Sequence, residues 1–155
     1  MKVHFMAGRK RNWRFSMTAH EYLGQIHELD IQIRRKQEKA RKIKESLYAS
    51  GISYENIGDA KPHNTGDAMG GAIAKVIDYL QEIEDDTARL IVLRIEADNI
   101  IGQLEDEAER RILEQHYLFY ESIEKIAEDM GYTTRTVYRY RNSGLEKLTF
   151  PESCH

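Results

Sequence analysis

The sequence has very few of the residues and patterns that mark several large protein classes. Its 155 residues include one cysteine, Cys154, and two prolines. A single cysteine excludes an internal disulfide framework and a cysteine cluster for zinc. No apolar run approaches the roughly 18 residues that cross a bilayer, and the first 17 residues lack the apolar stretch of a secretory signal. We therefore expect a soluble chain in a reducing cytoplasm, without contact to a membrane.

Charge is unevenly distributed along the chain, although the net charge is only −3. Residues 1–20 carry a net charge of +5 and residues 21–50 of +2, whereas residues 51–105 carry −7 and the remainder −3. Such a division indicates parts with different partners. Residues 1–17 show no helical pattern and are predicted to form a flexible basic leader, and residues 150–155 a tail.

Two long helices are predicted between residues 18 and 105. Thr18 and Glu21 fit a capping box that begins the first helix, and Gly51 marks its end. The first helix has a narrow stripe at three- and four-residue steps, formed by Tyr22, Ile26, Leu29, Ile33, Lys36, Ala40, Ile43 and Leu47. The second has a longer stripe, formed by Met69, Ile73, Val76, Leu80, Ile83, Thr87, Leu90, Arg94, Ala97, Ile101 and Leu104. Residues 50–66 have no sustained period and are predicted to be the connecting loop.

The two stripes predict a long antiparallel hairpin that resembles a coiled coil. Two helices with narrow stripes bury them most simply against each other or across a dimer. The basic run between Arg34 and Lys44 faces a second helix that is acidic, so we interpret it as the flank of the hairpin in preference to a nucleic-acid contact. The second stripe extends beyond what the first helix covers, which predicts a homodimer or a higher homo-oligomer.

Residues 106–149 predict a compact module of three short helices. Ser122 and Gly131 are placed to begin and end the middle helix, and Thr133 or Thr134 to begin the last. A helix-turn-helix needs a small residue where its helices cross and a turn residue that tolerates positive φ, which Ala127 and Gly131 supply. The residues expected to lock the two helices together are Ile123, Ile126, Ala127, Met130, Gly131, Tyr132, Val137 and Tyr140. The predicted fold class is therefore all-α, with a hairpin over 18–105 followed by this helix-turn-helix module.

The solvent face of the last helix predicts a contact with double-stranded DNA. Residues 131–145 contain three arginines and no acidic residue. Arginine suits the major-groove edge of guanine, whereas threonine, tyrosine and asparagine contact bases or phosphates. The candidates for reading bases are Thr134, Arg135, Tyr138 and Arg139. The candidates for phosphate contacts are Thr133, Arg141 and Asn142.

This module resembles the fourth region of bacterial sigma factors. The resemblance lies in residues 109–117 (ERRILEQHY), 122–132 (SIEKIAEDMGY), 136–138 (TVY) and 145–148 (LEKL), and it covers about residues 107–149. His116 and Gly144 depart from the arginine and alanine that are usual there. The layout of a long helix pair before the module is similar, in pattern only, to ArpU-like and RinA-like late-gene regulators of Gram-positive phages and prophages. The resemblance implies promoter recognition in a bacterial cell, with RNA polymerase as a further candidate partner.

The residues give no support for an enzyme, a metal site or a cofactor. His20 and His27 lack a carboxylate or cysteine at ligand spacing, and no nucleophile accompanies His116. We expect a DNA-binding transcriptional regulator of phage or prophage type. Two alternatives remain: a DNA-packaging adaptor like a small terminase subunit, and a coiled-coil scaffold whose C-terminal module binds protein.

Overall fold

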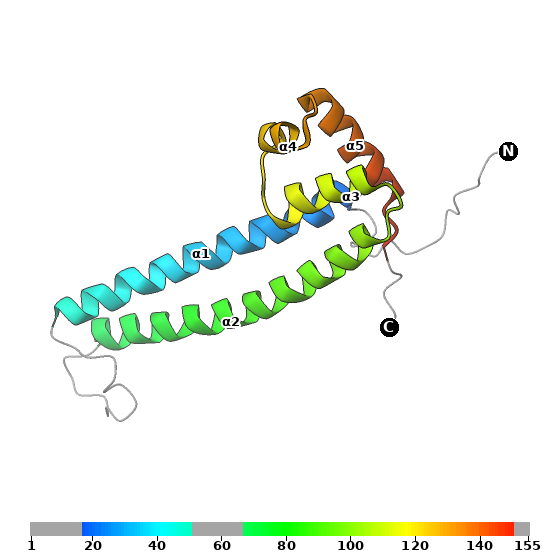
Figure 1. Ribbon diagram of the computed structural model, residues 1–155. Coiled ribbons are helices and arrows are strands. Elements are labelled where there is room, and N and C mark those ends of the chain that lie inside the picture. Colours follow the sequence, from blue (N-terminus) through cyan, green and yellow to red (C-terminus); the bar gives the residue numbers. More distant parts are fainter. Residues whose placement is uncertain (1–16, 51–66, 151–155) are drawn as a thin grey trace. The chain divides into compact units, whose positions relative to one another are not determined.

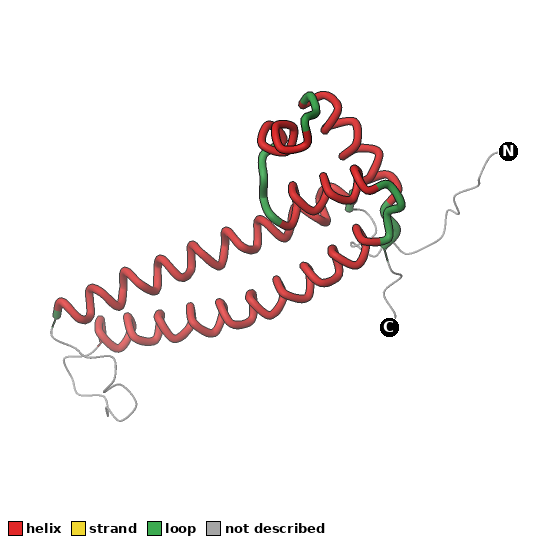
Figure 2. Tube along the Cα trace, viewed as in Figure 1, coloured by secondary structure: helices red, strands yellow, loops and turns green. Residues whose placement is uncertain are grey.

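The structure is a computed structural model that describes residues 17–50 and 67–150 (Figures 1 and 2). The predicted leader before Met17, the predicted loop from Gly51 onward and the tail after Phe150 lie outside the described residues. Every regular element in these ranges is a helix, which confirms the predicted all-α class. No helix in the described part of the chain is both long and apolar enough to cross a membrane.

The two predicted long helices are present, with ends close to those expected. Helix α1 runs over Ala19–Ala49 and α2 over Asp67–Gly102 (Figure 1). The predicted capping box begins α1: the Thr18 N–H donates to a Glu21 carboxylate oxygen at 2.8 Å, and the Glu21 N–H donates to Thr18 Oγ1 at 3.2 Å. α2 ends slightly before the expected residue 105, because the N–H groups of Gln103 and Leu104 donate to carbonyls only three residues back, those of Ile100 and Ile101.

The contacts divide the described chain into two compact units. One unit contains residues 26–49 of α1 and 67–96 of α2, and the other contains residues 17–25 and 97–150. The first turns of α1 therefore belong with the C-terminal helices. This division differs from the predicted domain boundary after residue 105, which remains a prediction.

In the first of these units, α1 and α2 run antiparallel, and side chains of the two helices contact each other. Lys36 Nζ forms ion pairs with Glu82 at 2.9 Å and with Asp86 at 2.6 Å. One turn further along α1, Lys39 lies 6.0 Å from the ring of Tyr79. The later residue of α1 thus contacts the earlier residue of α2, as it must when two helices run antiparallel. The buried side chains in this unit are Ile26, Leu29, Ile33, Ala40, Leu47 and Val76. Lys36 fills the one gap in the apolar stripe by pairing its charge across the helices.

The predicted stripe of α2 is only partly buried in this unit. Met69, Leu80 and Arg94 are exposed, whereas Ile73, Ile83, Thr87 and Leu90 are half-buried. The single helix α1 covers only part of the surface of α2, which is 36 residues long. Some side chains of the α2 stripe therefore stay exposed to solvent.

The other unit contains four helical segments after α2. They are α3 (Glu107–Leu113), the π-helical turn η3 (Glu114–Leu118), α4 (Ile123–Met130) and α5 (Thr134–Lys147). Asp106 begins α3 by accepting hydrogen bonds from the N–H groups of Ala108 and Glu109. The core of this unit joins Ile112 of α3 to Ile123, Ile126 and Ala127 of α4 and Val137 of α5.

Two contacts attach the N-terminal end of α1 to this unit. The His20 ring and the Tyr117 hydroxyl form a hydrogen bond, and the rings of Tyr22 and Phe150 lie 4.9 Å apart. Leu23, in the same unit, is completely buried. His20 itself is exposed, and its hydrogen bond to Tyr117 was not predicted from the sequence.

Candidate nucleic-acid interface

The α4–α5 pair is held by a turn whose geometry follows from its sequence. Ser122 begins α4, because its hydroxyl accepts the Lys125 N–H at 3.2 Å. Gly131 has φ of +67°, which confirms the left-handed residue expected at the end of α4. The Gly131 N–H donates to Glu128 and the Tyr132 N–H to Ala127, which together form a Schellman motif. The chain then starts α5 at Thr133, whose hydroxyl accepts the Thr136 N–H.

The predicted packing residues lie between α4 and α5, with two exceptions. Ile123, Ile126, Ala127 and Val137 are buried, and Met130 and Tyr140 pack against them. Gly131 lies in the exposed turn. The prediction was wrong for Tyr132, which is 38% exposed. It is the second residue after α4, and its ring stacks on that of Tyr140 with the ring centroids 5.8 Å apart.

All four candidates for base contacts point to solvent. Thr134, Arg135, Tyr138 and Arg139 are exposed, and the last three lie on the side of α5 opposite the buried Val137. Arg139 lies 5.5 Å from the ring of Tyr140, so its guanidinium is partly oriented by the aromatic face. The Arg135 side chain makes no ion pair with the described residues. This face therefore presents cations that internal carboxylates do not neutralise.

The candidates for phosphate contacts differ among themselves. Thr133 is exposed but uses its hydroxyl to begin α5. Asn142 is exposed, and its Oδ1 accepts hydrogen bonds from Arg141 at 3.2 and 3.3 Å. Arg141 is half-buried and lies 4.9 Å from the ring of Tyr138. These contacts fix the Arg141 guanidinium in one orientation beside the exposed face.

An acidic residue limits the basic face at its C-terminal end. Glu146 is exposed and follows Asn142 by one turn. A carboxylate at this position opposes a phosphate backbone, so the surface available to an anion is the first three turns of α5. The candidates for base contacts all lie in the first two of these turns.

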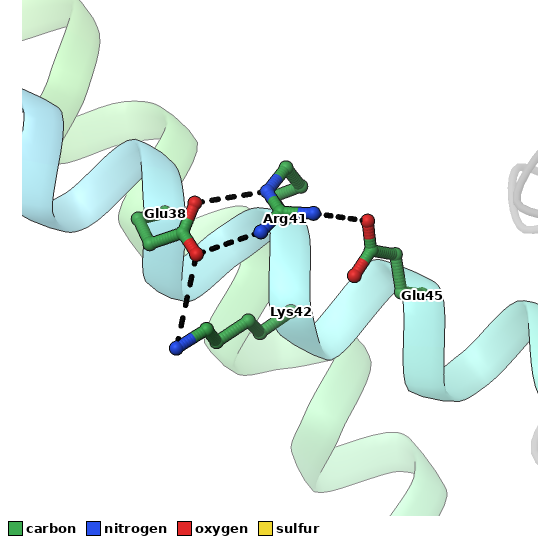
Figure 3. Close-up of polar contacts among 4 residues, drawn as sticks. All are labelled: Glu38, Arg41, Lys42 and Glu45. Carbon is green, nitrogen blue, oxygen red and sulfur yellow. Dashed lines mark hydrogen bonds and ion pairs between the residues drawn. The ribbon is translucent and has the colours of Figure 1, made fainter.

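The basic run of α1 lies in the other unit, and several of its cations form ion pairs with acids of the same helix or of α2. Arg41 pairs with Glu38 at 2.7 Å and with Glu45, and Lys42 lies 3.7 Å from Glu38 (Figure 3). Hydrogen bonding to Arg41 lowers the pKa of Glu38, so this carboxylate stays charged. Arg34 pairs with Asp30, and Lys36 with Glu82 and Asp86. These pairs support the interpretation of the run as a helical flank.

Sequence reasoning missed the irregular connection between α3 and α4. The first of the three short helices predicted for this module has Leu118 and Phe119 as its last apolar positions, but Leu118 is half-buried and Phe119 is 69% exposed. The cause is the π-helical turn, in which the Phe119 N–H donates to Glu114. Tyr120 then adopts φ of +59°. His116 binds the Glu121 carbonyl at 2.9 Å, which places it in the packing of this connection.

Comparison with known proteins identifies the family of this chain. Residues 71–149 match the family described as a protein of unknown function, DUF1492. The chain belongs to this family. The matching part of this DUF1492 protein begins in α2 and continues through α3, η3, α4 and α5. Neither the curated proteins nor the solved structures include a match.

Proposed function

We propose that this DUF1492 protein binds double-stranded DNA through the exposed face of α5 and acts as a transcriptional regulator of phage or prophage type. The observation that carries the proposal is the placement of Arg135, Tyr138 and Arg139 on one exposed, acid-free face. The opposite side of α5 packs on α4 across a left-handed glycine turn. That arrangement is typical of a helix-turn-helix, whose second helix enters the major groove.

The chemistry of the face suits base reading better than simple charge attraction. An arginine fork can donate two hydrogen bonds to guanine in the major groove. Arg135 and Arg139 are four residues apart and therefore lie one turn apart on the same side of α5, as neighbouring base contacts require. Arg141, fixed by Tyr138 and Asn142, is suited to one phosphate at the edge of this face.

The proposal is tested by DNA binding to fragments that flank the protein's own gene. Arg135→Ala and Arg139→Ala should each weaken binding to the preferred sequence by about 1–3 kcal/mol. Arg141→Ala should weaken binding to all sequences alike and reduce its salt dependence. Fluorescence anisotropy at several salt concentrations measures both effects.

The matched control is Arg34→Ala/Arg35→Ala on α1, which removes the same charge as the Arg135→Ala/Arg139→Ala double variant. Both α1 residues are exposed, but they lie in the other unit, outside the face of α5, and Arg34 pairs with Asp30. We expect this control to keep sequence preference. Unchanged binding by the folded Arg135→Ala/Arg139→Ala variant would refute the proposal.

The same face would also serve a DNA-packaging adaptor. Preference for a fragment upstream of a regulated gene supports the transcriptional role, whereas preference for a packaging start site supports the adaptor role. RNA polymerase remains a candidate partner on the strength of the sigma-factor resemblance alone.

A further inference from the structure

Helix α2 has a second heptad-like stripe on the side that faces away from α1. Its members follow one another at alternating three- and four-residue steps, and every one of them is exposed. We name this stripe the outer seam, and it consists of Ala74, Ile77, Gln81, Glu84, Ala88, Ile91 and Ile95. All seven residues belong to the unit that contains residues 26–96.

The outer seam is not the surface that α1 covers. The residues of α2 that contact α1 include Asp86 and Tyr79, which are half-buried and lie on the other side of the helix. On the outer seam, Ile77 is 50% exposed, Ile91 53% and Ile95 58%. Five of the seven seam residues are apolar, and the two central ones, Gln81 and Glu84, are polar. A solvated helix face is normally polar, and exposed apolar side chains gathered along one line of a helix mark an interaction site.

The outer seams of two copies complement each other when the two α2 helices run antiparallel. If Gln81 lies opposite Glu84 of a second, antiparallel copy, then Ile77 lies opposite Ala88 and Ala74 opposite Ile91. Ile77 and Ile91 each meet an alanine, which lets the two helices interlock closely at these layers. In each of the two central layers, the Gln81 amide of one copy can donate to the Glu84 carboxylate of the other. Neither polar side chain is then buried against an apolar one.

The other simple alignments are poorer. A parallel pair in register places Glu84 against Glu84 of the other copy, where two like charges repel in a partly desolvated seam. An antiparallel pair shifted by one heptad places Glu84 against Ala88 and Gln81 against Ile91, which leaves the polar groups without partners. The sequence of the seam therefore favours one register.

We propose that the outer seam of α2 is a self-association surface, along which two copies pair antiparallel with Gln81 of each copy against Glu84 of the other. The occupant is thus a second copy of this chain. The proposal concerns only the unit of residues 26–96, and it is independent of DNA binding by α5.

The first test measures the mass of the full chain by sedimentation equilibrium at tens of micromolar. We expect twice the chain mass of 18.1 kDa for the wild type and for Ile91→Leu. Ile91→Lys places a charge in the seam and should halve the mass without loss of helicity in circular dichroism. Tyr48→Lys is the matched control, because Tyr48 of α1 is also 53% exposed and lies outside the seam.

The second test determines direction and register by disulfide cross-linking. Cys154 is replaced by serine, and Ile77→Cys and Ala88→Cys are made on separate, differently tagged chains. In the proposed register, mild oxidation of the mixture links position 77 of one chain to position 88 of the other. A parallel pair in register gives only links between identical chains, and that result overturns the proposal. A wild type with the mass of one chain, or a dimer that survives Ile91→Lys, also overturns it.

Discussion

Glu109 is the buried charged residue of the described chain whose position most affects the C-terminal unit. It is 3% exposed on α3 and accepts hydrogen bonds from Ser143 Oγ at 2.6 Å and from Lys147 Nζ at 2.7 Å. The bond to Glu109 raises the pKa of Lys147, which keeps the ammonium charged. Both donors lie on the last turns of α5, so this carboxylate fixes α5 to α3.

We predict that Glu109→Ala lowers the free energy of unfolding of the C-terminal unit by about 1–3 kcal/mol, because the Ser143 hydroxyl loses its acceptor and Lys147 its partner. The control is Glu107→Ala, two residues earlier on the same helix but exposed. It should change stability by no more than about 0.5 kcal/mol. Chemical denaturation followed by circular dichroism measures both, and equal effects would contradict the role of Glu109.

Gly144 illustrates what a sequence pattern hides at a single position. In the sequence it is a departure from the alanine that is usual in sigma-like modules, and a glycine near the end of a helix predicts only that its last turns are weaker. In the structure Gly144 is buried, and a Cβ there would lie 3.1 Å from Leu113 Cδ1 and 3.3 Å from Glu109 Cβ. The glycine therefore allows α5 to approach α3 closely. That close approach depends on tertiary packing, which periodicity does not reveal.

The capping box at the start of α1 has a defined pH dependence. The hydrogen bond from the Thr18 N–H, followed by that from its hydroxyl, lowers the pKa of Glu21 from its ordinary value of 4.5. A carboxyl group whose pKa is lower when folded stabilises the protein above its unfolded pKa. This contribution is lost as the pH falls through the lowered folded value.

We therefore predict that Glu21→Gln lowers the melting temperature at neutral pH, where the charged capping box is intact. The difference from the wild type should shrink as the pH falls below the ordinary value of 4.5 and the wild-type carboxylate becomes protonated. Thermal melts across this range provide the measurement. Glu146→Gln, at an exposed position on α5, is the control, and a difference that is constant with pH would contradict the prediction.

At the scale of elements, regular helices were predictable and irregular ones were not. α4 has the predicted limits, because Ser122 and Gly131 are strong local signals at its two ends. The turn η3 was not predicted. Its hydrogen bond joins residues five apart instead of four, so the side chains after it point to other sides of the helix than the regular 3.6-residue period predicts. Phe119 is exposed for that reason. The exposure of the candidate DNA-binding residues followed from the 3.6-residue period of α5, whereas the half-burial of Arg141 depends on its neighbours.

At the scale of the whole molecule, the C-terminal unit is built from two distant parts of the chain. Residues 17–25 pack with residues 97–150, through His20, Tyr22 and Leu23 among others. The apolar stripe of α1 predicted that this helix packs along its length. It did not predict that the first turns contact a different partner from the rest, because a stripe defines a buried face without identifying what covers it.

This division predicts that two leucines on one helix stabilise different units. Leu23 is fully buried in the C-terminal unit, and Leu29 is 7% exposed in the unit of residues 26–96. Each leucine-to-alanine change should cost about 2–5 kcal/mol, because it removes buried methyl groups and leaves a cavity. Hydrogen exchange measured by mass spectrometry locates the loss. Leu23→Ala should reduce amide protection in α3, α4 and α5, whereas Leu29→Ala should reduce it in residues 26–49 and 67–96. If both variants reduced protection equally in both units, the molecule would unfold as one cooperative body and the division would be wrong.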